Sequence, residues 1–242
     1  MEKIVAEIQH LKKSFGKNPV LKDISLKIEQ GENFVVFGKS GCGKTVLIKC
    51  LVGLLEPDEG KIILLEKDVS TLKEEELNIL RKKVGFLFQS AALYDSMTVR
   101  ENLEFPLRDI KGKPQEEIDA LVLEVLKNVG LEASIDKMPS ELSGGMRKRI
   151  GLARTLILKP EIILYDEPTT GLDPITSKEI SMLILDVQKK YNAASIIITH
   201  DKECAHITAN RMMVIKDGLA AAEGTYDELS NSKDEFVASF FK

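Results

Sequence analysis

The residues with the clearest chemistry form a glycine-rich segment at positions 38–45, with the sequence GKSGCGKT. This segment matches the pattern G-x-x-x-x-G-K-[ST], which binds phosphates where it connects a buried strand to a helix. It follows the apolar run NFVVFG at 33–38 and precedes the apolar run VLIKCLVGLL at 46–55. We therefore predict that this phosphate-binding loop holds the phosphates of a nucleotide.

The positions of this loop have different expected parts in binding. Glycines let backbone N–H groups surround a phosphate, Lys44 supplies positive charge to the β- and γ-phosphate oxygens, and the Thr45 hydroxyl coordinates Mg²⁺. The predicted nucleotide-binding residues are Gly38, Lys39, Ser40, Gly41, Cys42, Gly43, Lys44, Thr45 and Val46. For Cys42 two roles stay open. Either its backbone alone matters, or its thiol, whose pKa tends to fall at a helix N-terminus, blocks nucleotide binding when it is oxidised.

Polar side chains end three further apolar runs. Asp166 and Glu167 follow IILY, His200 follows SIIIT, and Gln89 follows VGFLF. An open α/β sheet holds its ligand at the carboxyl ends of its strands. There, Asp166 suits a Mg²⁺ site, and Glu167 suits the group that orients and polarises an attacking water.

A second anion-facing helix start is expected in SELSGGMRKRIGLARTL, residues 140–156. Ser143, Gly144 and Gly145 precede a run at helical spacing, and the free N–H groups of a helix start favour negative charge. One chain therefore carries two helix starts suited to phosphate, about a hundred residues apart.

The pattern of the chain predicts a two-lobed α/β domain spanning residues 1–242. Apolar runs at 33–38, 83–89, 161–168, 194–200 and 211–218 predict strands of a parallel sheet that is covered on both faces. The first thirty residues alternate, which suggests an antiparallel edge. Residues from about 92 to 155 show only helical patterns and predict a helical subdomain. Expected helix signals are capping boxes at Thr71/Glu74, Thr98/Glu101 and Thr225/Glu228, a cap at Asp173 before Pro174, and a helix end at Gly130.

Composition argues against nucleic acid as a partner. With a net charge of −4 and a pI near 5.6, the chain lacks the overall positive charge that attracts nucleic acid. The apolar runs are shorter than the roughly 18–20 residues that span a bilayer, and the first residues lack a signal-peptide pattern. Three cysteines without metal-site spacing suggest reduced thiols in a cytosol.

Together these motifs resemble the ATP-binding cassette ATPases along the whole chain. LSGGM at 142–146 resembles the family signature, ILYDE at 163–167 the Walker B strand, and GLD at 171–173 the D-loop. The resemblance implies a P-loop NTPase fold with a RecA-like parallel core, an antiparallel β edge and an inserted helical subdomain. It also implies ATP and Mg²⁺ as ligands. The implied catalytic residues are Glu167, His200 and Gln89, the implied metal ligands are Thr45, Gln89 and Asp166, and Phe15 is expected to stack on adenine.

The resemblance also implies why there are two phosphate-facing helix starts. Cassettes of this family dimerise head to tail, so Ser143, Gly144, Gly145 and Asp173 would contact the ATP held by the phosphate-binding loop of a second copy. The usual signature glutamine is Met146 here, which leaves the sugar and water contacts of that glutamine undefined.

Among cassette proteins, FQSAALYDSMTVRENLEFPLR at 88–108 and Met146 are similar to the ATPase subunits of Mla-type, Mce-associated phospholipid transporters. This similarity implies transmembrane permease subunits, an Mce-type lipid-binding partner, and a peripheral position on the cytoplasmic face of the inner membrane. Alternatives are a cassette of another importer or exporter, a regulatory cassette without transport, and a repair or translation cassette. The last class usually has coiled coils, zinc modules or two cassettes, which are not evident here. A GTPase is disfavoured because no N-K-x-D motif follows.

The C-terminal segment 225–242 suggests a short amphipathic helix with Phe236, Phe240 and Phe241 on its apolar side. It would pack either on its own cassette or on a partner.

Overall fold

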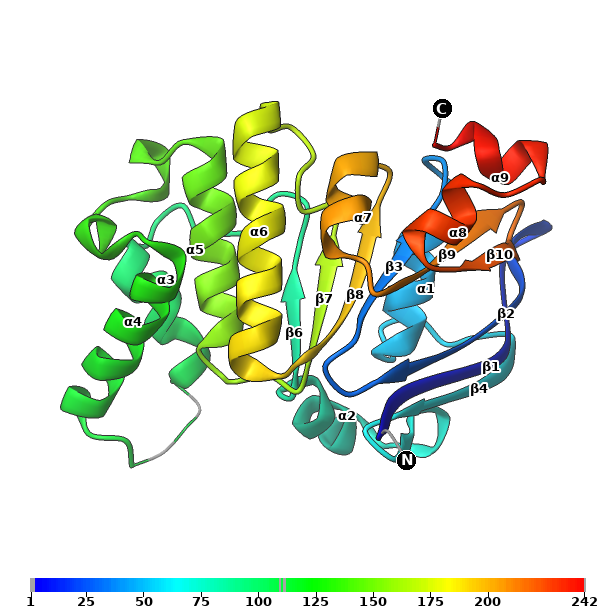
Figure 1. Ribbon diagram of the computed structural model, residues 1–242. Coiled ribbons are helices and arrows are strands. Elements are labelled where there is room, and N and C mark those ends of the chain that lie inside the picture. Colours follow the sequence, from blue (N-terminus) through cyan, green and yellow to red (C-terminus); the bar gives the residue numbers. More distant parts are fainter. Residues whose placement is uncertain (1–2, 109, 111, 242) are drawn as a thin grey trace.

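The fold is known from a computed structural model that describes residues 3–108, 110 and 112–241. The strands are β1 Ile4–Phe15, β2 Asn18–Glu29, β3 Asn33–Phe37, β4 Glu59–Leu64, β5 Lys67–Asp68, β6 Val84–Leu87, β7 Ile162–Asp166, β8 Ala194–Thr199, β9 Arg211–Lys216 and β10 Leu219–Gly224. The α-helices are α1 Lys44–Leu51, α2 Glu74–Arg81, α3 Val99–Glu104, α4 Gln115–Val129, α5 Gly144–Leu156, α6 Pro174–Tyr191, α7 Lys202–Thr208, α8 Tyr226–Ser230 and α9 Glu235–Ser239. Figure 1 shows their arrangement.

The described strands form one sheet in the order β5-β4-β1-β2-β10-β9-β3-β8-β7-β6. The five strands from β9 to β6 are parallel, whereas β1 pairs in antiparallel fashion with both β2 and β4. The structure therefore confirms the parallel core and the antiparallel edge. In the parallel part, the carboxyl ends of the strands all meet at the upper edge of the sheet in Figure 1.

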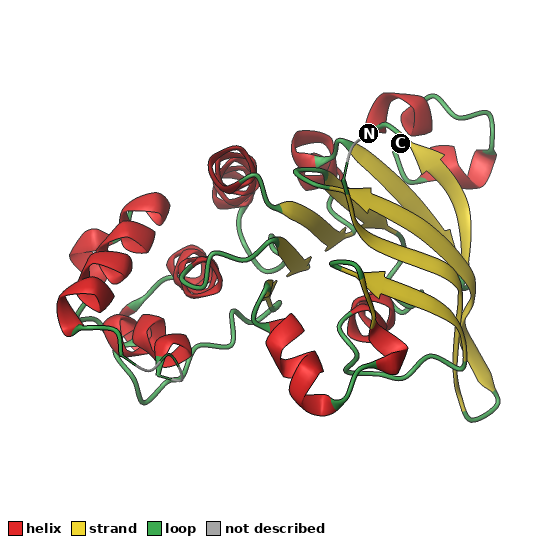
Figure 2. Ribbon diagram, turned by 90° about the horizontal axis from the view of Figure 1, so that it is seen from below, coloured by secondary structure: helices red, strands yellow, loops and turns green. Residues whose placement is uncertain are grey.

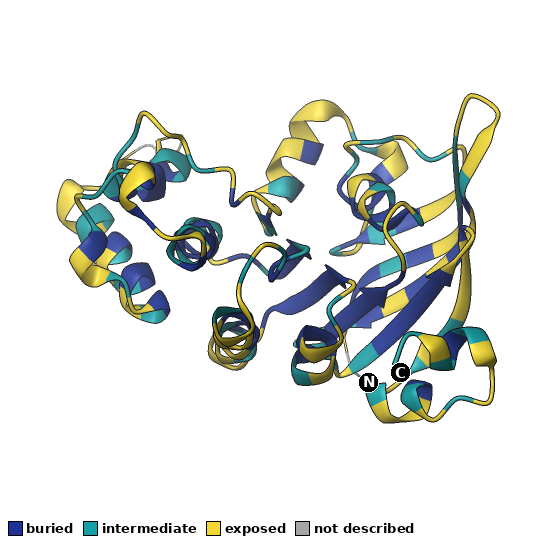
Figure 3. Ribbon diagram, turned by 90° about the horizontal axis from the view of Figure 1, so that it is seen from above, coloured by how far each residue is buried: buried dark blue, intermediate teal, exposed yellow. Residues whose placement is uncertain are grey.

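The parallel strands are buried on both faces, which explains why their sequences are continuously apolar. In β3, Val35 and Phe37 join one hydrophobic cluster, and Phe34 and Val36 join the other. Successive side chains of a strand point to opposite faces, so one short run supplies both cores. Helices cover both faces of this part of the sheet, and its strands are largely buried (Figures 2 and 3).

The described residues between 92 and 155 form α-helices and short 3₁₀ turns and no strand, as expected from their pattern. In Figure 1 these helices, α3 to α5, lie to the left of the parallel strands. The long α4 ends at Gly130, which has φ +67 and donates to carbonyls of the last turn. No helix within the described residues combines the length and apolar character needed to cross a membrane.

Two of the three predicted capping boxes are confirmed, at Thr98/Glu101 and Thr225/Glu228. The one predicted at Thr71/Glu74 is wrong. Asp68 caps a 3₁₀ turn at Val69–Thr71, and the Thr71 hydroxyl donates back to the carbonyl of Asp68 at 2.8 Å. That hydroxyl belongs to the preceding turn, and α2 begins after Lys73 instead.

Candidate nucleotide-binding and hydrolysis site

The phosphate-binding loop leaves the carboxyl end of β3 and enters α1, as its motif requires. Lys44 lies almost fully buried at the first position of α1, and its ammonium donates to the carbonyl oxygens of Gly38 at 2.7 Å and Lys39 at 3.2 Å. Gly43 has φ +104, and a Cβ at this position would lie 2.7 Å from the Leu21 side chain. Only glycine fits both the backbone angle and the space there.

The carboxylates that end β7 reach this loop. Asp166 Oδ1 accepts from the Thr45 hydroxyl at 3.4 Å, and Glu167 Oε1 lies 3.7 Å from the Lys44 ammonium. His200, directly after β8, places Nδ1 2.8 Å from Glu167 Oε2. When Glu167 is ionised it can only accept, so Nδ1 carries the shared proton and Nε2 is the nitrogen left to face a ligand.

Glu167 is held in an uncommon backbone conformation. Its φ is +50, which costs a non-glycine residue on the order of 1–3 kcal/mol. The conformation is fixed from several sides: its N–H donates to the carbonyl of Ile198 at 2.9 Å, and its carboxylate accepts from Thr170 at 3.2 Å. Strain of this kind is found where a side chain must be aimed, and here it aims a carboxylate at Lys44.

One cavity of about 420 Å³ joins these groups. It is lined by Val20, Ser40, Gly41, Gly43, Lys44, Thr45, Val46, Gln89, Asp166, Glu167, Thr170 and His200. The structure therefore brings the phosphate-binding loop together with all four polar residues predicted at strand ends. Gln89 lies two residues beyond the end of β6 and is exposed, so it enters the cavity from a loop.

The donor set suits a small, hard cation held jointly with phosphates. Thr45, Asp166 and Gln89 offer a hydroxyl, a carboxylate and an amide oxygen, the oxygen ligands that Mg²⁺ prefers. Among the described residues, no group of three or more His, Cys, Asp or Glu side chains could hold a metal. Burial, with the neighbouring Glu167 charge, raises the pKa of Asp166. A cation bound there would offset both effects.

The pKa of the Cys42 thiol differs from the value expected from the sequence. Partial burial raises the pKa of its thiol, and this outweighs the lowering effect of the Lys44 charge and of backbone hydrogen bonds. The expected fall in pKa at the helix start is thus wrong, and the residue is not a preformed thiolate.

The second predicted helix start, at Ser143, is also confirmed. Ser143 is the N-cap of α5, and its hydroxyl accepts from the Met146 N–H at 3.3 Å. Ser143 and Gly144 are exposed, whereas a Cβ on Gly145 would lie 2.4 Å from the Thr176 side chain. Asp173, exposed at the start of α6, accepts from the N–H groups of Ile175 and Thr176. These four signature and D-loop residues do not line the cavity around Lys44.

Phe15, the predicted adenine platform, ends β1 and is 49% exposed. It does not line the cavity either, and the Lys13 ammonium lies 5.8 Å from its ring centroid. Its stacking role stays a prediction.

Two residues of α5 were missed by the sequence reasoning. Lys148 is 5% exposed and donates to the carbonyl of Glu167 at 3.1 Å, and Arg154 donates to the carbonyls of Ala91 and Ala92. Burial lowers the pKa of Lys148 to about 8 against the opposing charges of Asp166 and Glu167. A signal was present, because Lys148 lies in the buried stripe of Gly145, Leu152 and Leu156.

Comparison with known proteins gives a consistent result. Residues 21–170 match the family described as ABC transporter. The chain is 40% identical over 237 residues to a probable ribonucleotide transport ATP-binding protein of Mycobacterium leprae, with 98% of this chain and 68% of that protein covered. It is 37% identical to the intermembrane phospholipid transport system ATP-binding protein MlaF of Haemophilus influenzae, covering 100% of this chain and 92% of the relative. It is 38% identical to the methionine import ATP-binding protein MetN of Clostridioides difficile, covering 92% and 70%. The chain thus spans about two thirds of the mycobacterial relative and nearly all of the phospholipid one.

Solved structures agree with the fold. The structure of cbiO1 of Clostridium perfringens, described as part of the ABC transporter complex cbiONQ, superposes with a TM-score of 0.89 at 29% identity, covering 96% of this chain and 92% of that one. A dimeric structure of the ATP-binding cassette MJ0796 in a post-hydrolysis state with ADP and Pi superposes with a TM-score of 0.82 at 30% identity, covering 91% and 98%.

Proposed function

We propose that this chain, which belongs to the ATP-binding cassette ATPases of ABC transporters, drives a membrane transporter of phospholipid. On this proposal it binds and hydrolyses ATP as a dimer. Family membership follows from the match over residues 21–170 and from relatives named as transport ATP-binding proteins. Its ATPase character agrees with the structural neighbour described with ADP and Pi bound. The observation that carries the chemistry is the single cavity that joins Lys44, Asp166, Glu167 and His200.

In the proposed reaction, Lys44 and the loop N–H groups bind the phosphates of ATP, and Glu167 orients water toward the γ-phosphate. His200 holds Glu167 through Nδ1 and presents Nε2 toward the phosphate. Thr45, Asp166 and Gln89 would hold Mg²⁺, which would supply positive charge to offset the negative charge of the phosphates. The protein residues thus account for binding, aiming and water positioning.

The signature residues support a composite site. Ser143, Gly144, Gly145 and Asp173 lie outside the cavity of their own chain, and the exposed start of α5 is available to a partner. We infer that a second copy presents these residues to the bound ATP, as in a dimeric cassette. The neighbour MJ0796 is described as a dimer, which supports this arrangement.

Phospholipid is the favoured substrate class because of the extent of the match. Of the relatives reported above, the one named for phospholipid transport aligns with the whole chain over nearly its own full length. The similarity of residues 88–108 and of Met146 to that branch points the same way. On this proposal the partners are a second copy, permease subunits and an Mce-type lipid-binding protein, with the ATPase on the cytoplasmic face of the inner membrane. Import of a small solute is the second candidate, favoured by the MetN relative.

A pull-down of tagged protein from detergent-solubilised native membranes, with mass spectrometry of proteins and lipids, tests the substrate. We expect a polytopic permease, an Mce-type protein and enriched phospholipid. Phe88 is 41% exposed in the segment expected to face the permease, so Phe88→Ala should lower the amount of permease recovered. Leu54 is 53% exposed elsewhere, and Leu54→Ala is the matched control, which should leave this amount unchanged. A different permease without lipid enrichment would overturn the phospholipid proposal while leaving the ATPase in place.

A further inference from the structure

Lys148 forms an unusual contact between α5 and the hydrolysis site. Its side chain is 5% exposed, and its ammonium donates to the backbone carbonyl of Glu167 at 3.1 Å. The N–H of Thr170 donates to the same oxygen at 3.3 Å. The carbonyl of Glu167 therefore accepts one hydrogen bond from its own turn and one from a different helix.

The contact lies where it can restrict the direction of the Glu167 side chain. Glu167 has φ +50, a conformation that persists only when its surroundings hold it. The carbonyl and the side chain of one residue share a Cα, so fixing the first restricts the direction of the second. The ammonium also brings positive charge close to Asp166 and Glu167, the two carboxylates of the site.

Arg154 makes a parallel contact six residues further along α5. Its guanidinium donates to the carbonyl of Ala92 at 2.8 Å and to that of Ala91 at 3.0 Å. Both alanines have positive φ, +49 and +60, and they follow Gln89. One helix thus contacts two segments that contain non-glycine residues with positive φ. The first contains Glu167, which lines the nucleotide cavity, and the second follows Gln89, which also lines it.

We propose that Lys148 is a positioning residue that connects the Ser143 end of α5 to Glu167 of the same chain. Lys148 follows Ser143 by five residues, about 7.5 Å along a helix. When the phosphate of a partner's nucleotide contacts Ser143, it displaces or fixes the start of α5. Lys148 transmits this change in the position of α5 to Glu167, the carboxylate that activates water. Each chain thereby couples the site it completes to the site it contains. This inference rests on the proposed dimeric ATPase.

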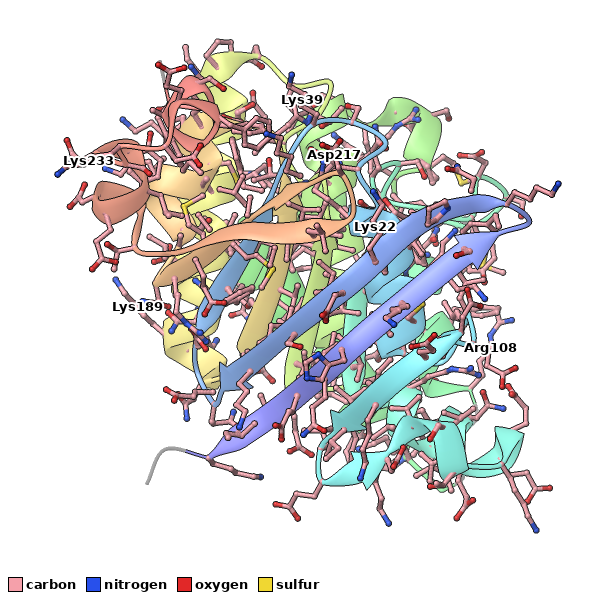
Figure 4. The ribbon with its side chains drawn as sticks, turned by 90° about the vertical axis from the view of Figure 1, so that its right-hand side faces the viewer. Lys22, Lys39, Arg108, Lys189, Asp217 and Lys233 are labelled. Carbon is pink, nitrogen blue, oxygen red and sulfur yellow. The ribbon has the colours of Figure 1, made fainter. Side chains whose placement is uncertain are left out.

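Steady-state ATPase kinetics test the role. Lys148→Met keeps an unbranched side chain, one atom shorter, and removes its charge and its hydrogen-bond donors. Lys148→Arg keeps a positive charge and donors. Lys189 is an exposed lysine at the end of α6 and lies well away from Lys39 of the loop in Figure 4, so Lys189→Met is the matched control. We expect Lys148→Met to lower kcat at least about tenfold with KM for ATP within about twofold of the parent. Lys148→Arg should restore at least about half of the parental kcat, and the control should match the parent.

A kcat of Lys148→Met within about twofold of the parent would overturn the proposal, as would an arginine variant as slow as the methionine variant.

Amide hydrogen exchange provides a readout that does not need turnover. With ATP present, Lys148→Met should exchange faster than the parent at residues 167–171, with exchange in β8 unchanged. Unchanged exchange at 167–171 contradicts the proposal whatever the ATPase rate. A parent that fails to hydrolyse ATP contradicts the proposed function instead, and the exchange result still decides the contact.

Discussion

At the scale of single residues, the site depends on Glu167 being aimed by its neighbours. His200 and Thr170 contact one carboxylate oxygen, and Lys44 lies 3.7 Å from the other. A glutamine would fill the same volume but could not act as a general base toward water.

We therefore predict that Glu167→Gln binds ATP with near-parental affinity while its hydrolysis rate falls about 10²–10⁴-fold. With hydrolysis blocked, the ATP-bound dimer should accumulate. ATPase assays and size-exclusion chromatography with ATP measure both effects, and Glu116→Gln on the exposed side of α4 is the control. Hydrolysis at a near-parental rate would remove Glu167 from the role of water activator.

Cys42 gives a second residue-scale prediction, based on its raised thiol pKa. Because the thiolate is the reactive form, iodoacetamide should modify Cys42 more slowly than a free small-molecule thiol at pH 8, with a rate that increases as the pH rises past 9. ATP should protect it, since it lies in the phosphate-binding loop. Mass spectrometry of the Cys42 peptide over time measures this. Rapid modification at pH 7 would show a lowered pKa instead.

At the scale of elements, the sequence predicted the parallel strands and most helix caps because their signals are local. The run NFVVF and the box at Thr98/Glu101 each contain the residues that form the element. The Thr71 prediction failed because Asp68 competed for the same turn. The contact between Lys148 and Glu167 joins residues nineteen positions apart through the packing of α5, and such contacts leave no local pattern beyond a lysine in a buried stripe.

The C-terminal segment, helix α9 with the two residues that follow it, shows the same dependence on packing. Phe240 and Phe241 lie 5.6 and 5.9 Å, between ring centroids, from Phe37, the buried residue that precedes the phosphate-binding loop. The structure therefore supports packing on its own cassette. We predict that Phe240→Ala combined with Phe241→Ala lowers the free energy of unfolding by about 2–4 kcal/mol and leaves the oligomeric state unchanged.

Urea unfolding and light scattering measure these two effects. Ile79→Ala, at a side chain 65% exposed, is the control and should change stability little. Unchanged stability with altered assembly would instead assign α9 to a partner contact.

At the scale of the whole molecule, the separation of Ser143 from Lys44 has a testable consequence. In Figure 1, α5 and β3, which leads into the phosphate-binding loop, lie apart in the molecule. The cavity around Lys44 does not include Ser143. If the proposed dimeric site is correct, a single chain should therefore bind ATP and hydrolyse it poorly, because the partner would supply part of each site.

Mixing two inactive variants tests this division. Ser143→Arg keeps its own phosphate-binding loop and blocks the partner's site, whereas Lys44→Ala weakens its own loop and keeps an intact Ser143. In a mixed dimer, the loop of the Ser143→Arg chain meets the Ser143 of the Lys44→Ala chain, which forms one complete site. We expect each variant alone to lose about 90% or more of its activity, and an equimolar mixture to recover a measurable part through this one site. Full activity of Ser143→Arg alone would contradict the shared site, because the arginine side chain would then stand clear of the phosphate that it is expected to block.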